Sequence, residues 1–303
     1  MRIKLLYILV VAAAIVAGFL IVYVKWPSPR LGSESYIQLD GGAIFLETVP
    51  SPDSLAYSYK VLVIGGDGLS KDDIGFLKTR NSLVLGYINV GKLYSERFRE
   101  YVESVGIVHN VEGLGEVVEF WRSEWRTIII SELDRIYGLG YDGVLLDDVD
   151  IYKLLENDRP EWCGDRDLRL SMEELIVGLI RYCRENLNAS FGIYLGFSYD
   201  LEMLDMDIIY DSVDGVFFRG LWHVLSEGEV IKICECEVGH IFAKLDEAVA
   251  DGKLVVIVDP VEDEADAREF SSVARLRGYI PVPQPVEYWD FSRPPPPNYY
   301  ENL

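Results

Sequence analysis

The sequence has very little histidine, which limits the catalytic centres it can form. Its 303 residues include three histidines, His109, His223 and His240, which lie far apart in the chain. A histidine-based metal centre and a Ser-His-Asp triad both need such side chains in a suitable pattern, so we expect neither. The "GGDG" stretch at 65–68 lacks the spacing of a dinucleotide-binding loop, and "DDVD" at 147–150 lacks the Gly and distal Glu of a calcium loop. We therefore expect no metal and no cofactor.

Cysteine is also scarce, with four residues in the whole chain: Cys163, Cys183, Cys234 and Cys236. The last two are too close together for the usual Cys-x-x-Cys zinc or redox motif. In an exported chain an even number allows two disulfides. Buried free thiols are one alternative, and a metal site is another.

Positive charge is in deficit. There are 28 Lys and Arg against 50 Asp and Glu, which gives a formal net charge of −22. Such a surface repels the phosphates of nucleic acids and anionic lipids, so we expect no nucleic-acid partner. The same charge would attract a cationic partner, or simply keep an exported protein soluble.

An uncharged hydrophobic run at residues 5–24 follows Arg2 and Lys4. About 20 apolar residues suffice for a membrane-spanning helix, whereas the core of a signal peptide is about 7 to 15 residues long. No clear cleavage site follows the run. We therefore predict a membrane anchor or signal segment at 1–30, an extracellular domain at 31–290 and a proline-rich tail at 291–303. A single span would hold the protein at the cell membrane, and a secreted protein is the alternative.

From about residue 33 onward, β-branched runs alternate with helical patterns, which is typical of βα units and a parallel sheet. In the helix predicted at 171–187, Ser171 and Glu174 form a capping-box pattern. The predicted strands lie at 35–40, 60–66, 82–90, 142–148, 191–197, 212–218, 253–259 and 278–283. Eight such units predict an α/β fold, a (β/α)8 TIM barrel preceded by the transmembrane helix. A doubly wound open sheet is the alternative.

Three carboxylates, Asp147, Asp148 and Asp150, cluster where the predicted strand at 142–148 ends. In a parallel barrel, side chains at the carboxyl ends of the strands line the active-site mouth. Alternation places Asp147 on the face of Leu145 and Asp148 on the opposite face. Carboxylates this close raise one another's pKa, so one can stay protonated for acid catalysis while another is ionised. A helix cap is the alternative role, but a helix start needs one such acid and not three.

The stretch "GYDGVLLDDVDIY" at 140–152 resembles the "GfDGVyLDNvDay" signature of glycoside hydrolase family 114, the endo-α-1,4-polygalactosaminidases and their relatives. Segments at 36–41, 84–102, 117–136 and 251–282 resemble other parts of the same family, in the same order and at similar spacing. The resemblance covers roughly residues 35–290.

This resemblance implies a TIM-type barrel that hydrolyses an α-linked amino-sugar polysaccharide, with Asp147 as a catalytic carboxylate. Asp150 matches a second acid of the family, with a substrate or structural contact. Residues at the positions of Tyr87, Asn89 and Gln38 line the family's cleft. We add Asp148 and Trp222 to the expected substrate-binding residues, as a neighbouring carboxylate and a ring that can stack on sugars. A polymer of galactosamine is cationic, which suits an acidic cleft.

The sequence departs from the family at four places. The fifth strand ends in "LGFSYD" and lacks the Asn that the family often carries. Asp148 stands where the family usually has Asn, and Lys92 where it often has Glu. The sixth strand ends in "VDGVFFRG", with Phe217, Phe218 and Arg219 where the family has a Glu.

A glycosidase usually needs two carboxyl groups, so the second must come from elsewhere. Asp67, at the end of the second strand, and Asp259 or Glu262, at the end of the seventh, are the candidates by position. The sequence therefore predicts an extracellular, membrane-anchored glycoside hydrolase. A catalytically silent barrel that binds surface polysaccharide is the alternative.

Overall fold

The computed structural model describes residues 43–46, 58–65, 68–226 and 228–288. The predicted membrane anchor, the strand predicted at 35–40 and the proline-rich tail lie outside these residues. Within the described ranges, every helix is too short or too polar to cross a bilayer.

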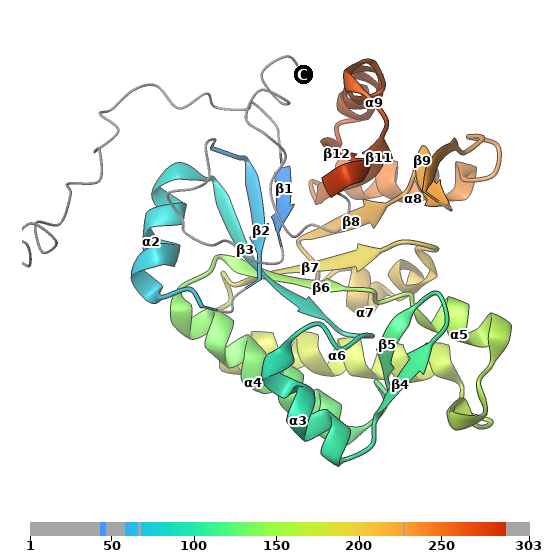
Figure 1. Ribbon diagram of the computed structural model, residues 1–303. Helices are drawn as coiled ribbons and strands as arrows, with labels where there is room; N and C mark the ends of the chain where they lie inside the picture. Colours follow the sequence, from blue (N-terminus) through green and yellow to red (C-terminus); the bar gives the residue numbers. More distant parts are fainter. Residues whose placement is uncertain (1–42, 47–57, 66–67, 227, 289–303) are drawn as a thin grey trace, which may run out of the picture. The chain divides into compact units, whose positions relative to one another are not determined.

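Eight parallel strands form one sheet, in the order β1-β2-β3-β6-β7-β8-β11-β12 (Figure 1). The strands are β1 (Ala43–Leu46), β2 (Val61–Ile64), β3 (Leu83–Asn89), β6 (Gly143–Asp147), β7 (Gly192–Phe197), β8 (Gly215–Arg219), β11 (Leu254–Val261) and β12 (Ile280–Pro285). The order never reverses, which excludes the doubly wound sheet, because that sheet has a switch point. Cα atoms of the edge strands β1 and β12 lie within 8 Å of one another, so the sheet is curled.

Seven of the eight predicted strands are confirmed. Each is a short apolar run that is buried along nearly its whole length. Parallel strands covered on both faces read as such continuous runs. The first strand of the sheet, β1, was not predicted at its observed place.

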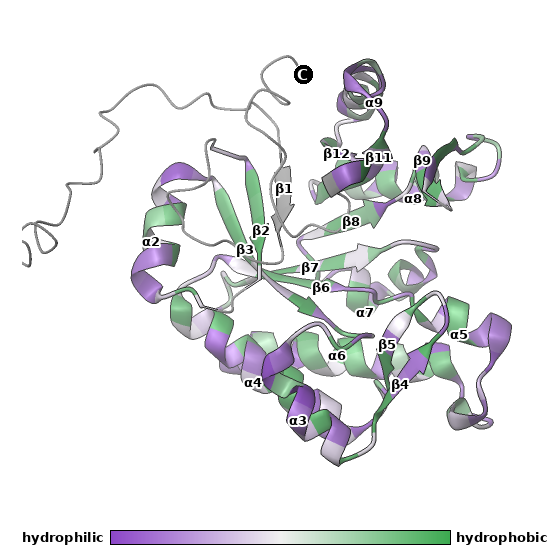
Figure 2. Ribbon diagram, in the orientation of Figure 1, coloured by the Kyte–Doolittle hydropathy of each residue, from purple (hydrophilic) through white to green (hydrophobic). Residues whose placement is uncertain are grey.

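The two faces of the sheet pack into separate hydrophobic clusters. Alternate residues such as Val63, Leu145 and Phe217 form an inner cluster. Their neighbours, such as Leu146 and Phe218, join a larger cluster with the helices. Figure 2 shows the strands as largely hydrophobic and the helices as mixed. The inner face therefore decides which side chains at the strand ends can meet.

The helices cover the outer face and alternate with the strands, as the sequence pattern predicted. They are α2 (Lys71–Arg80), α3 (Glu96–Ser104), α4 (Ser123–Leu139), α5 (Tyr152–Asp158), α6 (Leu168–Asn186), α7 (Asp207–Tyr210), α8 (Gly239–Ala250) and α9 (Glu264–Leu276), with short 3-10 turns at Glu161–Cys163, Glu202–Asp205 and Val286–Tyr288.

The predicted capping box of α6 is wrong. The helix begins three residues earlier, and the side chain of Asp167 accepts the backbone N–H of Leu170. Ser171 lies inside the first turn, where its hydroxyl donates to the carbonyl of Asp167.

Two antiparallel hairpins were not predicted. They are formed by β4 (Val108–Val111) with β5 (Gly115–Val118), and by β9 (His223–Ser226) with β10 (Glu229–Lys232). They follow β3 and β8 in the chain, beyond the carboxyl ends of those two strands. The second hairpin contributes to the pocket described below.

The expectation of two disulfides is wrong. Cys234 and Cys236, just after β10, form a disulfide. Cys163 and Cys183 are buried free thiols. Each of these two packs within the outer hydrophobic cluster, which explains their burial without a bond.

Candidate active site

Polar side chains from three strands meet at the carboxyl ends of the sheet, on its inner face. Tyr87 and Asn89 end β3, Asp147 ends β6 and Arg219 ends β8. Each follows a residue of the inner cluster by two or four positions. Because successive side chains of a strand alternate between its faces, all four side chains point to the inner face. Asn89 and Asp147 are directly paired across the β3–β6 ladder. The sheet register thus brings these residues together.

Asp147 is almost fully buried, with 2% of its surface exposed. Its Oδ2 accepts a hydrogen bond from the Tyr87 hydroxyl at 3.0 Å and lies 3.1 Å from Nη1 of Arg219. The prediction that Asp147 shares the face of Leu145 is confirmed. A buried carboxylate with a cation and a hydroxyl donor on one oxygen is held in a fixed orientation.

Asp148 does not lie on the opposite face, as simple alternation predicted. The strand ends at Asp147, and Asp148 has a left-handed backbone with φ of +56°. This turn brings its carboxylate to the same guanidinium: Oδ1 lies 2.5 Å from Nη2 of Arg219. Oδ2 accepts from Asn89 at 2.8 Å and lies 3.1 Å from Lys92 Nζ. Asn and Asp are the residues that best tolerate this conformation after Gly, which fits the Asn that the family has at this position.

The environments of the two aspartates shift their pKa values in opposite directions. Burial raises the pKa of Asp147, although Arg219 opposes the shift. Burial also acts on Asp148, but there Arg219 and Lys92 outweigh it and lower its pKa. As pH falls, Asp147 therefore takes up a proton before Asp148 does. Such a divided pair is the pattern by which carboxylates take acid and base roles in one site.

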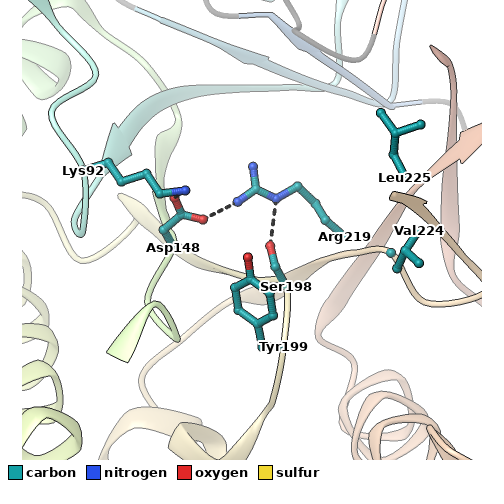
Figure 3. Close-up of a pocket in the computed structure, with 8 residues that line it drawn as sticks. Lys92, Asp148, Ser198, Tyr199, Arg219, Val224 and Leu225 are labelled. Carbon is teal, nitrogen blue, oxygen red and sulfur yellow. Dashed lines mark hydrogen bonds and ion pairs between the residues drawn. The ribbon is translucent and has the colours of Figure 1, made fainter. Parts of the chain in front are cut away.

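A pocket of about 300 Å³ opens beside this pair (Figure 3). In the figure, Lys92 and Arg219 reach toward Asp148 from opposite sides. The described residues that line it are Lys92, Asp148, Ser198, Tyr199, Arg219, Gly220, Val224 and Leu225. Asp147 is not among them, because Arg219 lies against it.

Asp150 holds a loop. Its Oδ2 accepts the backbone N–H groups of Ser198, Tyr199 and Asp200 at 2.6 to 3.0 Å. Two of these residues line the pocket. The carboxylate is fully buried, and its Oδ1 has no hydrogen-bond partner among the described residues. Of the two roles expected for this acid, these contacts support the structural one.

Burial raises the pKa of Asp150 from 3.8 to about 7. As pH rises from 4 to 7, the unfolded chain has lost this proton while the folded chain keeps it, so the stability of the folded state falls. The total effect is about 4 kcal/mol, since one pKa unit corresponds to about 1.4 kcal/mol. We expect Asp150→Asn, which mimics the protonated acid, to gain stability relative to the wild type over this window. Urea unfolding at pH 4 to 8 measures the difference, and a constant difference would contradict the shift.

Asp259 lies on the outer face. It follows Ile257 of the outer cluster by two residues, so its side chain points away from Asp147. Both of its oxygens accept backbone N–H groups of the loop after β8, from Leu221, Trp222 and His223, at 2.8 to 3.0 Å. The carboxylate of Asp259 therefore holds the loop after β8 in place.

The ring of Trp222 does not line the pocket. It packs against the rings of Phe242, Phe270 and Tyr279, with centroids 5.2 to 6.3 Å away, on the side of α8 and α9. The other two predicted site residues, Asp67 and Gln38, lie outside the described residues. In the part of the chain that the structure describes, no cluster of His, Cys, Asp and Glu could hold a metal ion.

Gly196 of β7 leaves room for Asp147. A Cβ atom at this position would overlap Oδ1 and Cγ of the Asp147 side chain. We expect Gly196→Ala to displace the carboxylate, lowering kcat and costing about 1 to 3 kcal/mol of stability, as overpacking does. Gly138→Ala is the control, because its Cβ would meet nothing within 4 Å in helix α4. Equal kcat in the two variants would contradict this role of Gly196.

Sequence reasoning missed the roles of Ser198, Tyr199 and the second hairpin, and it treated Lys92 and Arg219 only as departures from a family pattern. The sequence did contain a signal for Arg219. It lies two residues after Phe217, on the same face, at the end of a buried strand. Ser198 and Tyr199 directly follow β7, where parallel sheets carry their sites. The contribution of Val224 and Leu225 had no comparable signal.

Comparison with known proteins gives two relatives by sequence. The chain is 27% identical over 235 residues to an uncharacterized protein of Methanocaldococcus jannaschii, and 23% identical over 219 residues to one of Thermotoga maritima. These matches cover 70% and 69% of this chain, and the chain spans 64% of the length of each relative.

Among solved structures, the glycoside hydrolase domain of PelA from Pseudomonas aeruginosa matches with a TM-score of 0.65 at 18% identity, covering 83% of this chain and 96% of that one. Aspergillus fumigatus Ega3, solved in complex with galactosamine, matches with a TM-score of 0.58 at 13% identity, covering 81% and 90%. The model of glycoside-hydrolase family GH114 matches residues 24–283, and the chain belongs to this family.

Proposed function

We propose that the chain is a glycoside hydrolase that cleaves a polysaccharide, with Asp147 as proton donor and Asp148 as the carboxylate that stays ionised. The observation that carries this proposal is the joining of both carboxylates by Arg219, in environments that shift their pKa values apart. Family membership supports the reaction class. Asp148 then supplies the second carboxyl group. In other members of the family, a Glu on the sixth strand provides this group.

The roles follow from the contacts. Glycoside hydrolysis needs an acid that protonates the leaving oxygen and an ionised carboxylate that acts on the positive charge at the anomeric carbon. Burial raises the pKa of Asp147, which favours its role as the acid, and two cations lower the pKa of Asp148, which favours its ionised form. Tyr87 and Asn89 orient the pair through their hydrogen bonds. Arg219 has to shift for a substrate oxygen to reach Asp147, because that residue does not line the pocket.

The same burial of Asp147 favours a second candidate function. A barrel with Arg219 in place of the usual Glu, and with its remaining acid covered, can bind polysaccharide without cleaving it. Release of reducing ends separates the two functions. The full chain is incubated with neutral, acidic and amino-sugar polysaccharides, and we expect new reducing ends from at least one of them. Binding to a polymer with no cleavage of any would support the binder and overturn the hydrolase.

The substrate follows in part from the family. The resemblance supports an α-linked amino-sugar polymer, and the structural relative that was solved with galactosamine points the same way. The charges of the pocket support a different sugar, as argued in the next subsection.

We also propose a closed (β/α)8 barrel outside the cell, held by residues 5–24. The approach of β1 to β12 and the fold of the relatives support the barrel. The hydrophobic run supports the anchor, and a secreted form is the alternative. Protease treatment of intact cells tests the location: the barrel should be digested, and protection by intact cells would contradict it.

A further inference from the structure

We propose that this pocket takes an acidic sugar, and that the carboxylate of a hexuronic acid binds between Lys92 and Arg219. The inference rests on the proposed function, because it names the substrate class of the same site. It starts from one juxtaposition: Lys92, three residues beyond β3, and Arg219, at the end of β8, lie on either side of Asp148 at the pocket wall (Figure 3).

The pocket reverses the charge balance of the chain. Acidic residues outnumber basic ones by 50 to 28 in the whole sequence. Among the described residues that line the pocket there are two cations and one carboxylate. Asp147 lies behind Arg219 and does not line the pocket, so in the protonated form proposed above it leaves the wall with a net positive charge, which attracts anions where most of the surface repels them.

Both cations have N–H groups left for a ligand. Each terminal nitrogen of Arg219 carries two N–H groups and contacts one aspartate among the described residues. The ammonium of Lys92 has three, and its contact is with Asp148. Both side chains are about a quarter exposed, so these groups are open to the pocket. A planar carboxylate fits a guanidinium fork and a neighbouring ammonium.

A cationic sugar finds no comparable partner here. An ammonium group needs an acceptor, and Asp148 is the carboxylate among the described lining residues. Its oxygens already contact three donors, Arg219 at Oδ1 and Asn89 and Lys92 at Oδ2. An amino sugar would therefore meet two positive charges and one carboxylate whose charge both cations already share.

The rest of the wall suits a sugar ring. Tyr199 is 44% exposed, Ser198 offers a hydroxyl, and Val224 and Leu225 give apolar surface. A substrate carboxylate on Arg219 also competes with Asp147 for the guanidinium. Weakening that contact opens the way to the proton donor.

Three tetrasaccharides test the proposal: α-1,4-linked galacturonic acid, galactose and galactosamine, which share linkage and ring configuration and differ in charge. Calorimetry with the full chain should show galacturonate binding about ten- to a hundredfold tighter than galactose, as expected for hydrogen bonds to charged groups. Galactosamine should bind weakest. Raising the salt concentration should weaken the galacturonate complex selectively. Equal affinities, or tightest binding of galactosamine, would overturn the proposal.

Variants of Lys92 test whether this side chain causes the preference for galacturonate. Lys92→Gln should lose most of the preference for galacturonate over galactose, and Lys92→Arg should keep it. A preference unchanged in Lys92→Gln would place the acidic group elsewhere and overturn the assignment. Circular dichroism confirms the fold of each variant. The measurement is independent of catalysis: tight galacturonate binding without cleavage would overturn the hydrolase and leave this inference standing.

Discussion

Replacing Asp147 with Asn should lower kcat by about 10²- to 10⁴-fold, the contribution typical of a positioned general acid. The amide keeps the size of the side chain but cannot donate the acid proton. Its Oδ1 or Nδ2 can still contact the Tyr87 hydroxyl, so we expect the fold and substrate affinity to change little. Steady-state kinetics measure the effect, with kcat and KM determined separately. The substrate is the polysaccharide from which the wild-type chain releases reducing ends.

The matched control is Asp165→Asn. Asp165 is an exposed aspartate without a hydrogen bond or ion pair among the described residues, and we expect its substitution to leave kcat unchanged. If Asp147→Asn kept the kcat of this control, Asp147 could not be the proton donor.

Removing the charge of Arg219 should cost about 3 to 5 kcal/mol of unfolding free energy, as the loss of one partner from a buried ion pair does. Arg219→Met keeps a long apolar side chain but leaves the ionised Asp148 and the carboxyl group of Asp147 without their shared cation. Asp147 and Asp148 have side chains that are 3% and 6% exposed, so water cannot replace the guanidinium. Chemical denaturation of the full chain measures the loss.

A double-mutant design separates this charge effect from packing. In a chain that already carries Asp147→Asn and Asp148→Asn, neither of the two carboxylates that contact Arg219 remains. The same Arg219→Met change should then cost far less. An equal cost in both backgrounds would show that Arg219 contributes through packing alone, and the ionic account of the site would fail.

The strands were predictable because a parallel sheet covered on both faces leaves a continuous apolar run in the sequence. The position of Asp147 followed from the same signal, since it ends such a run with the parity of Leu145. Parity also carried information that the sequence reasoning did not use. Counting by twos along β11 places Asp259 on the outer face with Ile257, which would have removed it from the candidates for the second carboxylate.

The partner of Asp147 was harder to predict because it depends on a single backbone conformation. Alternation holds only within a strand, and the left-handed turn at Asp148 brings two successive side chains to one guanidinium. The roles of Asp150 and Trp222 depend on loops, whose paths are set by contacts between distant segments. The same is true of the second hairpin, whose Val224 and Leu225 complete the pocket.

The central claim is that the Asp147–Asp148 pair hydrolyses a glycosidic bond. Cleavage in ¹⁸O-labelled water tests it most directly, with the oligosaccharide that binds tightest as substrate and mass spectrometry of the products. The account predicts one ¹⁸O atom in each newly formed reducing end for the wild type and for Asp165→Asn, and a rate at least about 10²-fold lower for Asp147→Asn. A wild-type chain that binds the oligosaccharide and incorporates no label, or an Asp147→Asn variant that incorporates it at the wild-type rate, would contradict the account.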